Sequence, residues 1–206
     1  MDVKHIIFDI DGTLIDTRYA ALKSLQDTLY EMKGKRHDIE DLAFAFGIPG
    51  AVTLQQLGVE DVELGNKLWN KHMHQYKQQM KCFDGIRDLL DSLCAEGYEL
   101  GIITSKTTQE YIDDFLPFGL EGYFDLALCV EDCPRPKPYA EPILEYIKRK
   151  HCQPEECIYI GDAIYDSQCA ANAGIKFGLA LWGKTDKQHI DADFVFEKPE
   201  DLLLAL

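Results

Sequence analysis

Two aspartates, Asp9 and Asp11, directly follow a short apolar run at residues 5–8. Other polar side chains follow three further apolar runs in the same way. In an open α/β sheet, ligands bind outside the carboxyl ends of the strands. If these runs are strands of one sheet, the polar side chains meet at a single edge. The further residues are Thr104 and Ser105 after residues 98–103, Lys137 in the loop after residues 125–130, and Asp162 and Asp166 after residues 157–160.

Carboxylates gathered at such an edge need a cation. Two like charges ~4 Å apart repel by roughly 4 kcal/mol at an effective dielectric constant of about 20. Aspartate oxygens without a nearby histidine or cysteine suit Mg²⁺, which also takes oxygens from a substrate phosphate. Each residue alone has an ordinary explanation, such as a turn, a strand end or a helix N-terminus. Their joint pattern favours a magnesium-dependent phosphate site.

Thr104 and Lys137 supply the other half of such a site. A hydroxyl and an ammonium group opposite the metal can hold the equatorial oxygens of a transferring phosphoryl group. One aspartate can then attack phosphorus and form an aspartyl-phosphate. A second carboxylate, two residues further on, can act as general acid and then as general base. The residue types therefore indicate phosphoryl transfer.

Strand-like and helix-like segments alternate along most of the chain. Short, nearly continuous apolar runs are typical of strands buried on both faces of a parallel sheet. Their alternation with helix-length segments predicts a doubly wound α/β fold. The expected strands are residues 5–8, 98–104, 125–130, 157–160, 177–181 and 193–196, and the expected helices are residues 84–96, 107–116, 139–151 and 164–173.

Residues 17–80 break this alternation, because they contain no convincing strand. Helix-like pieces separated by glycines predict a small all-helical insert after the first strand. The sequence FGIPG at residues 46–50 is a candidate to face the site, but we favour its interpretation as a plain turn between helices, and we interpret Trp69 as core of the insert or of its hinge.

Four motifs of the chain resemble, in order and spacing, those of the haloacid dehalogenase superfamily of phosphohydrolases. The motifs are DIDGT at residues 9–13, ITS at residues 103–105, Lys137 in RPKP, and GDAIYD at residues 161–166. The resemblance implies a Rossmann-like α/β core at residues 1–16 and 82–206. The insert resembles the cap of that superfamily, placed as in the phosphoglycolate phosphatase and β-phosphoglucomutase branches. This implies a helical cap domain at residues 17–81.

The resemblance also implies roles for four aspartates. Asp9 corresponds to the nucleophile and Asp11 to the general acid and base. Asp9, the backbone carbonyl of Asp11, and Asp162 correspond to the ligands of Mg²⁺. Asp166 corresponds to the residue that supports this set of ligands.

Most candidate substrate-binding residues come from the same resemblance, whereas Arg18 is a candidate because of its position in the insert. Thr104 and Lys137 correspond to the residues that bind the transferring phosphoryl group, and we expect Ser105 beside them. Lys106 follows directly, as in phosphoglycolate-phosphatase-like members, although a plain surface charge is the alternative. Arg18, near the start of the insert, is a further candidate, with a helix-start charge as its alternative.

The predicted function is that of a Mg²⁺-dependent phosphatase acting on a small phosphorylated metabolite, with 2-phosphoglycolate as the best single candidate. The alternatives are a phosphosugar mutase like β-phosphoglucomutase, a pyrophosphatase and, outside the enzymes, a receiver-like module that accepts phosphate. Few cations in the insert could hold a second phosphate, which favours hydrolysis over the mutase reaction. The insert also argues against a receiver.

The composition is that of a globular protein, with 46% hydrophobic and 28% charged residues. A formal charge of −15 argues against binding to nucleic acid or to an anionic membrane surface. No apolar run approaches the ~18 residues that span a bilayer. Seven cysteines without a CxxC pair favour reduced thiols in a cytoplasmic protein over disulfides or a zinc site. We expect a monomer or a homodimer.

Overall fold

The computed structural model of the chain describes residues 3–183 and 190–206. Six parallel strands form one sheet in the order β5-β4-β1-β6-β7-β8, so the first strand lies inside the sheet. The strand order reverses at β1, and open α/β sheets bind ligands at such a switch point. This sheet confirms the doubly wound fold expected from the sequence. The strands are β1 (His5–Phe8), β4 (Glu99–Ile103), β5 (Leu126–Leu128), β6 (Cys157–Gly161), β7 (Lys176–Ala180) and β8 (Phe194–Phe196).

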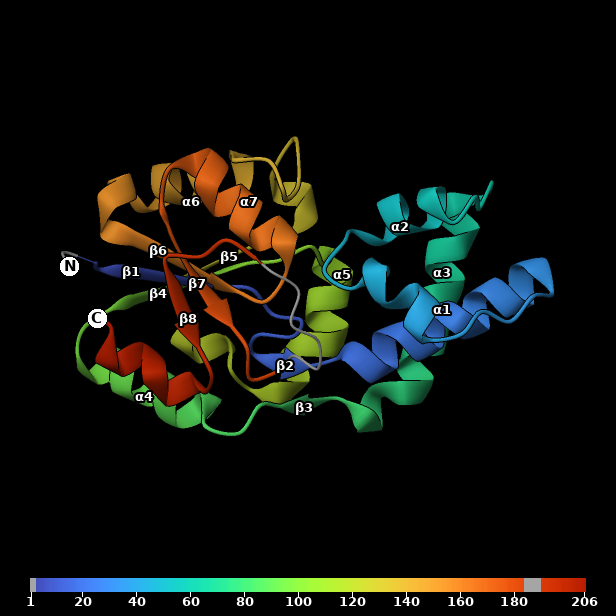
Figure 1. The fold of residues 1–206 in the computed structure, drawn as a ribbon, viewed down its shortest axis with the longest axis horizontal. Coiled ribbons are helices and arrows are strands. Elements are labelled where there is room, and N and C mark those ends of the chain that lie inside the picture. Colours follow the sequence, from blue (N-terminus) through green and yellow to red (C-terminus); the bar gives the residue numbers. More distant parts are fainter. Residues whose placement is uncertain (1–2, 184–189) are drawn as a thin grey trace.

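Helices cover both faces of the sheet (Figure 1). Ile6 and Phe8 of β1 belong to the apolar cluster that includes α4, and Ile7 belongs to the cluster that includes α6 and α7. A strand that is apolar at every position needs this cover on both sides. The core helices are α4 (Ile86–Ala95), α5 (Thr108–Glu110), α6 (Glu141–Lys150) and α7 (Ile164–Ala173), with a π-helix η3 (Tyr111–Phe115) and the 3₁₀ turns η4 (Leu116–Phe118), η5 (Glu121–Tyr123), η6 (Val130–Asp132), η7 (Pro154–Glu156) and η8 (Pro199–Leu204).

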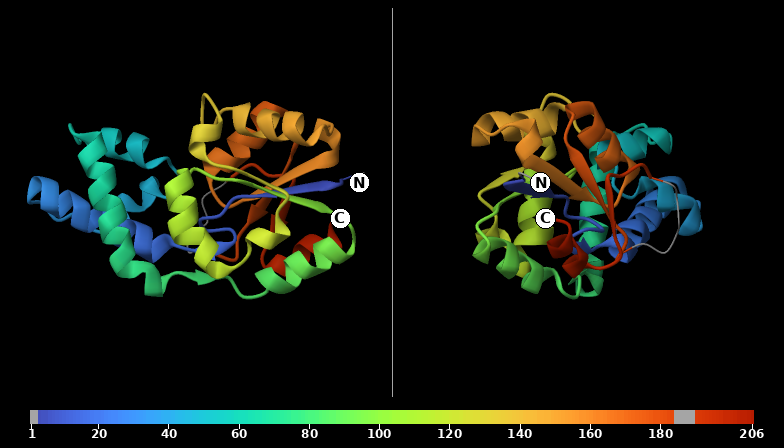
Figure 2. Two further views of the ribbon diagram at one scale, coloured as in Figure 1. Left: turned by 180° about the vertical axis from the view of Figure 1, so that it is seen from behind. Right: turned by 60° about the vertical axis from the view of Figure 1, so that its left-hand side comes forward.

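A helical insert, defined here as Arg18–Gln79, extends beyond the carboxyl ends of the strands (Figures 1 and 2). It has an apolar core of its own, in which Leu25 and Leu29 pack with Leu42 and Leu54. Within the described residues, no helix is long and apolar enough to cross a membrane. The elements of the insert are α1 (Arg18–Lys33), η1 (Glu40–Ala45), α2 (Gly50–Gln56), α3 (Val62–Met73) and η2 (His74–Gln79).

Two very short strands, β2 (Ile15–Asp16) and β3 (Lys81–Cys82), join the two ends of the insert. They pair antiparallel, with Ile15 opposite Cys82 and Asp16 opposite Lys81. The sequence did not indicate this second sheet. The pairing holds the segment that enters the insert beside the segment that leaves it, close to the end of β1.

Candidate active site

The turn after β1 places Asp9 and Asp11 at the carboxyl edge of the sheet. The backbone N–H of Asp9 donates to the carbonyl of Ile160 at 2.9 Å, which ties the turn to β6. Gly12 has a φ of +80°, a conformation that favours glycine. A Cβ atom at this position would lie 2.6 Å from a carboxylate oxygen of Asp162. The glycine of the DIDGT motif therefore lets the turn lie directly against the Asp162 side chain.

Three buried carboxylates converge at this edge. Asp9, Asp162 and Asp166 each offer one oxygen, and these oxygens lie within 4.8 Å of one another. Oxygen-only donors at this spacing are the ligand type that Mg²⁺ prefers. The residues present therefore fit a hard divalent cation. The Asp11 side chain is not one of these three donors, so its predicted part in metal binding would rest on its backbone carbonyl.

Lys137 links two of these carboxylates. Its Nζ atom lies 3.0 Å from Oδ1 of Asp9 and 2.6 Å from Oδ1 of Asp166, and the residue is only 3% exposed. Nζ also donates to the hydroxyl of Tyr159 at 3.1 Å, and that hydroxyl donates to the carbonyl of Ile103. Burial alone would lower the pKa of Lys137, but Asp166 and Asp9 outweigh burial and raise this pKa above its usual value. Lys137 is therefore a cation fixed in place beside Asp9.

Asp9 is 2% exposed and lies at the centre of the cluster. Burial is the largest effect on its carboxyl group, and Asp166 and Asp11 add to it by repulsion, while the attraction of Lys137 acts in the opposite direction. The net result raises the pKa of Asp9 from 3.8 to about 7. Without a metal ion, the three carboxylates of the cluster thus share a single lysine.

Asp11 faces a second buried lysine. Its Oδ1 atom accepts from the hydroxyl of Thr17 at 2.6 Å and lies 3.1 Å from Nζ of Lys106. Lys106 is 8% exposed and also contacts the buried Asp114 at 3.2 Å. Burial alone would lower the pKa of Lys106, but Asp11 and Asp114 raise it. Lys106 is therefore a buried ion-pair partner of Asp11 and not the surface charge considered as an alternative.

Thr104 and Ser105 follow β4 at the same edge. Thr104 is buried, its backbone N–H donates to the carbonyl of Leu128, and its Oγ1 accepts from the backbone N–H of Lys106 at 3.2 Å. The hydroxyl of Ser105 donates across to the insert, to the carbonyl of Gly47 at 3.3 Å. Ser105 thus joins the sheet edge to the loop at residues 46–50.

Tyr159 and Asp114 were not singled out in the sequence. Tyr159 lies in the middle of a buried strand, and a tyrosine at such a position is normally interpreted as a packing residue. Asp114 lies eight residues after Lys106, in the π-helix that follows α5. Such π-helical turns are frequent at functional sites, but their winding is not visible in a helical sequence pattern.

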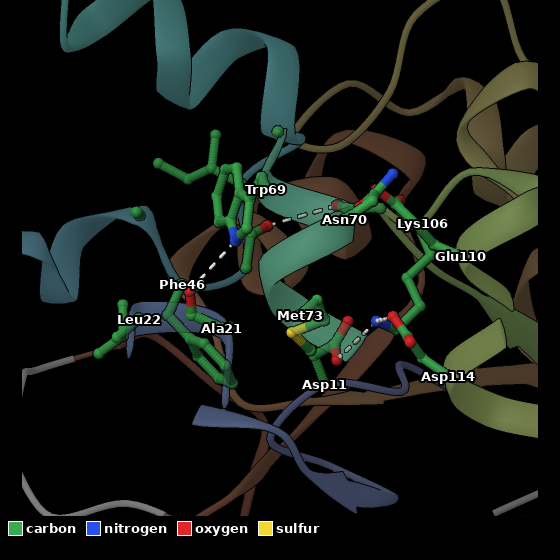
Figure 3. Close-up of a pocket in the computed structure, with 15 residues that line it drawn as sticks. Asp11, Ala21, Leu22, Phe46, Trp69, Asn70, Met73, Lys106, Glu110 and Asp114 are labelled. Carbon is green, nitrogen blue, oxygen red and sulfur yellow. Dashed lines mark hydrogen bonds and ion pairs between the residues drawn. The ribbon is translucent and has the colours of Figure 1, made fainter. Parts of the chain in front are cut away.

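A cavity of about 90 Å³ lies between the insert and the sheet edge, with Asp11 in its wall (Figure 3). The loop at residues 46–50, interpreted as a plain turn, contributes to this wall, and so does Trp69, interpreted as core. Arg18 is not among the lining residues; its guanidinium lies 5.6 Å from the ring centre of Phe46. The lining residues are Asp11, Ala21, Leu22, Ala45, Phe46, Gly47, Ile48, Gly50, Trp69, Asn70, Met73, Ser105, Lys106, Glu110 and Asp114.

Comparisons with known proteins agree with this architecture. Residues 6–180 match the family of haloacid dehalogenase-like hydrolases. Pyrophosphatase PpaX of Bacillus velezensis is 30% identical over 98% of this chain and 95% of the relative, and its namesake from Halalkalibacterium halodurans is 28% identical over 98% and 96%. A solved structure from Lactobacillus plantarum, provisionally assigned as a phosphoglycolate phosphatase, is 26% identical and superposes with a TM-score of 0.90 over 100% of both chains.

Proposed function

Because the chain belongs to the haloacid dehalogenase-like hydrolases, we propose that it hydrolyses small phosphate esters through an aspartyl-phosphate on Asp9. The observation that carries this proposal is the position of Asp9. It is buried at the switch point of the sheet, 3.0 Å from the Lys137 ammonium, and is one of three converging carboxylates. A nucleophile that attacks a phosphoryl group needs such positive partners close by.

The proposed metal ligands are Asp9, Asp162 and the backbone carbonyl of Asp11, with Asp166 in support. When bound there, Mg²⁺ would neutralise these carboxylates and the charge on the phosphoryl oxygens. Asp166 already accepts from Lys137 and from the backbone N–H of Ala163. Its carboxylate is thus held by the chain itself, which suits a supporting role.

In the first proposed step, an oxygen of Asp9 forms a bond to phosphorus and the bond to the ester oxygen breaks. Lys137 and Thr104 hold the phosphoryl oxygens during this transfer. Asp11 gives a proton to the departing alcohol. In the second step, Asp11 takes a proton from a water molecule, whose oxygen attacks phosphorus and releases Asp9 and inorganic phosphate.

The proposed substrate class is small phosphorylated metabolites. The sequence favours 2-phosphoglycolate, and the names of the relatives support either phosphoglycolate or pyrophosphate. A mutase would have to hold a second phosphate during its reaction, which calls for several cations. Among the described residues that line the cavity, Lys106 is the one cation. This favours hydrolysis over the mutase reaction. The seven free cysteines support our placement of the protein in the cytoplasm.

The replacement Asp9→Asn tests the proposal. It removes the nucleophile and one metal ligand with little change in volume, so turnover of p-nitrophenyl phosphate with Mg²⁺ should fall by several orders of magnitude. EDTA should abolish the activity of the unaltered protein, and Mg²⁺ should restore it. The exposed Asp38 provides the control, since Asp38→Asn should leave turnover unchanged. If Asp9→Asn keeps about a tenth of the activity or more, the assignment of the nucleophile is wrong.

A further inference from the structure

The wall that the insert gives to the cavity is largely apolar. Trp69 and Met73 lie on α3 and line the cavity together with Phe46 and Leu22 (Figure 3). The indole N–H of Trp69 donates to the carbonyl of Ala21 at 3.2 Å and to the hydroxyl of Ser24 at 2.9 Å. The polar atom of the indole is therefore already bonded inside the insert, and its ring contributes apolar surface to the cavity.

The charges in the cavity wall are mainly negative. The lining contains three carboxylates, those of Asp11, Glu110 and Asp114. Among the described residues that line the cavity, Lys106 is the single cation. Its ammonium lies 3.1 Å from Asp11 and 3.2 Å from Asp114. An anionic group entering the cavity would have to compete with both carboxylates for this lysine. Like charges held close together in a site of low dielectric constant repel strongly.

The position of the cavity gives it a role in the reaction. Asp11, the proposed proton donor to the departing alcohol, forms part of its wall. Asp9 lies two residues earlier in the same turn, outside the lining, and belongs to the acidic cluster. A phosphoryl group at Asp9 would therefore have its ester oxygen near Asp11 and the rest of the substrate in the cavity.

We propose that this cavity binds an uncharged, partly apolar leaving group. The substrate would then be the phosphate monoester of a small alcohol without a carboxylate or a second phosphate. This inference rests on the proposed function and makes its substrate class more specific. It departs from 2-phosphoglycolate and pyrophosphate, because both would bring a negatively charged leaving group against Asp11, Glu110 and Asp114.

The first test compares n-propyl phosphate with 2-phosphoglycolate, which are both phosphate esters of small primary alcohols. With the full chain and Mg²⁺, kcat/KM for n-propyl phosphate should exceed that for 2-phosphoglycolate by about tenfold or more, as expected for one unfavourable charge contact. Pyrophosphate should also be a poor substrate. A higher kcat/KM for either anionic compound would overturn the inference. Failure to hydrolyse any ester, p-nitrophenyl phosphate included, would instead reject the proposed function itself.

The second test adds a positive charge to the cavity wall. Asn70 is a half-buried lining residue on α3, and its side chain makes no hydrogen bond to the other described residues. Asn70→Lys should raise the ratio of kcat/KM for 2-phosphoglycolate to that for n-propyl phosphate by about tenfold. Gln56→Lys adds the same charge at an exposed position of the insert outside the lining, so it should leave the ratio unchanged. A folded Asn70→Lys protein with an unchanged ratio would show that the leaving group lies elsewhere.

Discussion

At the scale of single residues, Lys137 is the cation that Asp9 and Asp166 share. It is buried between Asp9 and Asp166, and its removal would leave two carboxylates without their shared cation. Breaking a buried ion pair by removing one partner costs about 3–5 kcal/mol. We therefore expect Lys137→Met to lower the free energy of unfolding by roughly 3 kcal/mol in EDTA, measured by urea denaturation.

Lys148 is the matched control for this replacement. It pairs with Glu145 at 3.4 Å, but its side chain is 77% exposed. Exposed pairs contribute little to stability, so Lys148→Met should leave the urea midpoint nearly unchanged. Equal effects of the two replacements would contradict the role assigned to Lys137.

Individual site residues differ in how well the sequence could locate them. Asp9, Lys137 and Asp162 were placed at one edge because each follows an apolar run, and the structure does bring them together. Asp114 could not be assigned as the partner of Lys106, because that contact depends on the π-helical winding after α5. The roles of these residues in catalysis stay predictions.

At the scale of elements, the turn between β1 and β2 leaves no room for an added methyl group at Gly12. Gly12→Ala would force an alanine into a φ of +80° and place its Cβ 2.6 Å from the Asp162 carboxylate. The backbone strain alone costs about 1–2 kcal/mol. Displacement of Asp162 should additionally weaken Mg²⁺ binding, so we expect both stability and kcat/KM to fall.

Gly34, which ends α1 with a φ of +67°, separates these two effects. Apart from its neighbours in the chain, no atom of the described residues would lie within 4 Å of a Cβ atom at this position. Gly34→Ala should therefore lose a similar free energy of unfolding through strain but retain kcat/KM for p-nitrophenyl phosphate. A comparable loss of activity in both proteins would mean that Asp162 is not displaced by the residue at position 12.

The six sheet strands could be predicted because each is a run of apolar residues between turn signals, and the structure confirms all of them within one or two residues. The pair β2 and β3 could not be predicted. Each strand has only two residues, and the pairing joins Ile15 to Cys82 across the whole insert. Two residues are too few for the alternation of side chains to be recognised.

At the scale of the whole molecule, the site is formed by two parts of the chain that meet. The sequence predicted a helical insert, but not how it would lie over the sheet edge. That position depends on contacts between distant segments, such as Ser105 with Gly47 and Lys77 with the carbonyl of Asp113. Phe46 and Trp69 became cavity residues only through this arrangement. The limits of the predicted cap, residues 17–81, stay a prediction.

The stability of the whole protein should depend jointly on pH and Mg²⁺. Burial raises the pKa of Asp9 from 3.8 to about 7, so the folded state keeps a proton in this range that the unfolded chain has lost. The contribution of Asp9 to the free energy of unfolding is thus fully present below pH 3.8 and is lost as the pH rises through about 7. At the proposed site, Mg²⁺ would bind the ionised carboxylate and would have to displace that proton at low pH. We therefore expect Mg²⁺ to raise the urea midpoint more at pH 8 than at pH 5.5. The reference at each pH is NaCl of equal ionic strength. Asp9→Asn should reduce this difference, and equal shifts at both pH values would contradict the account.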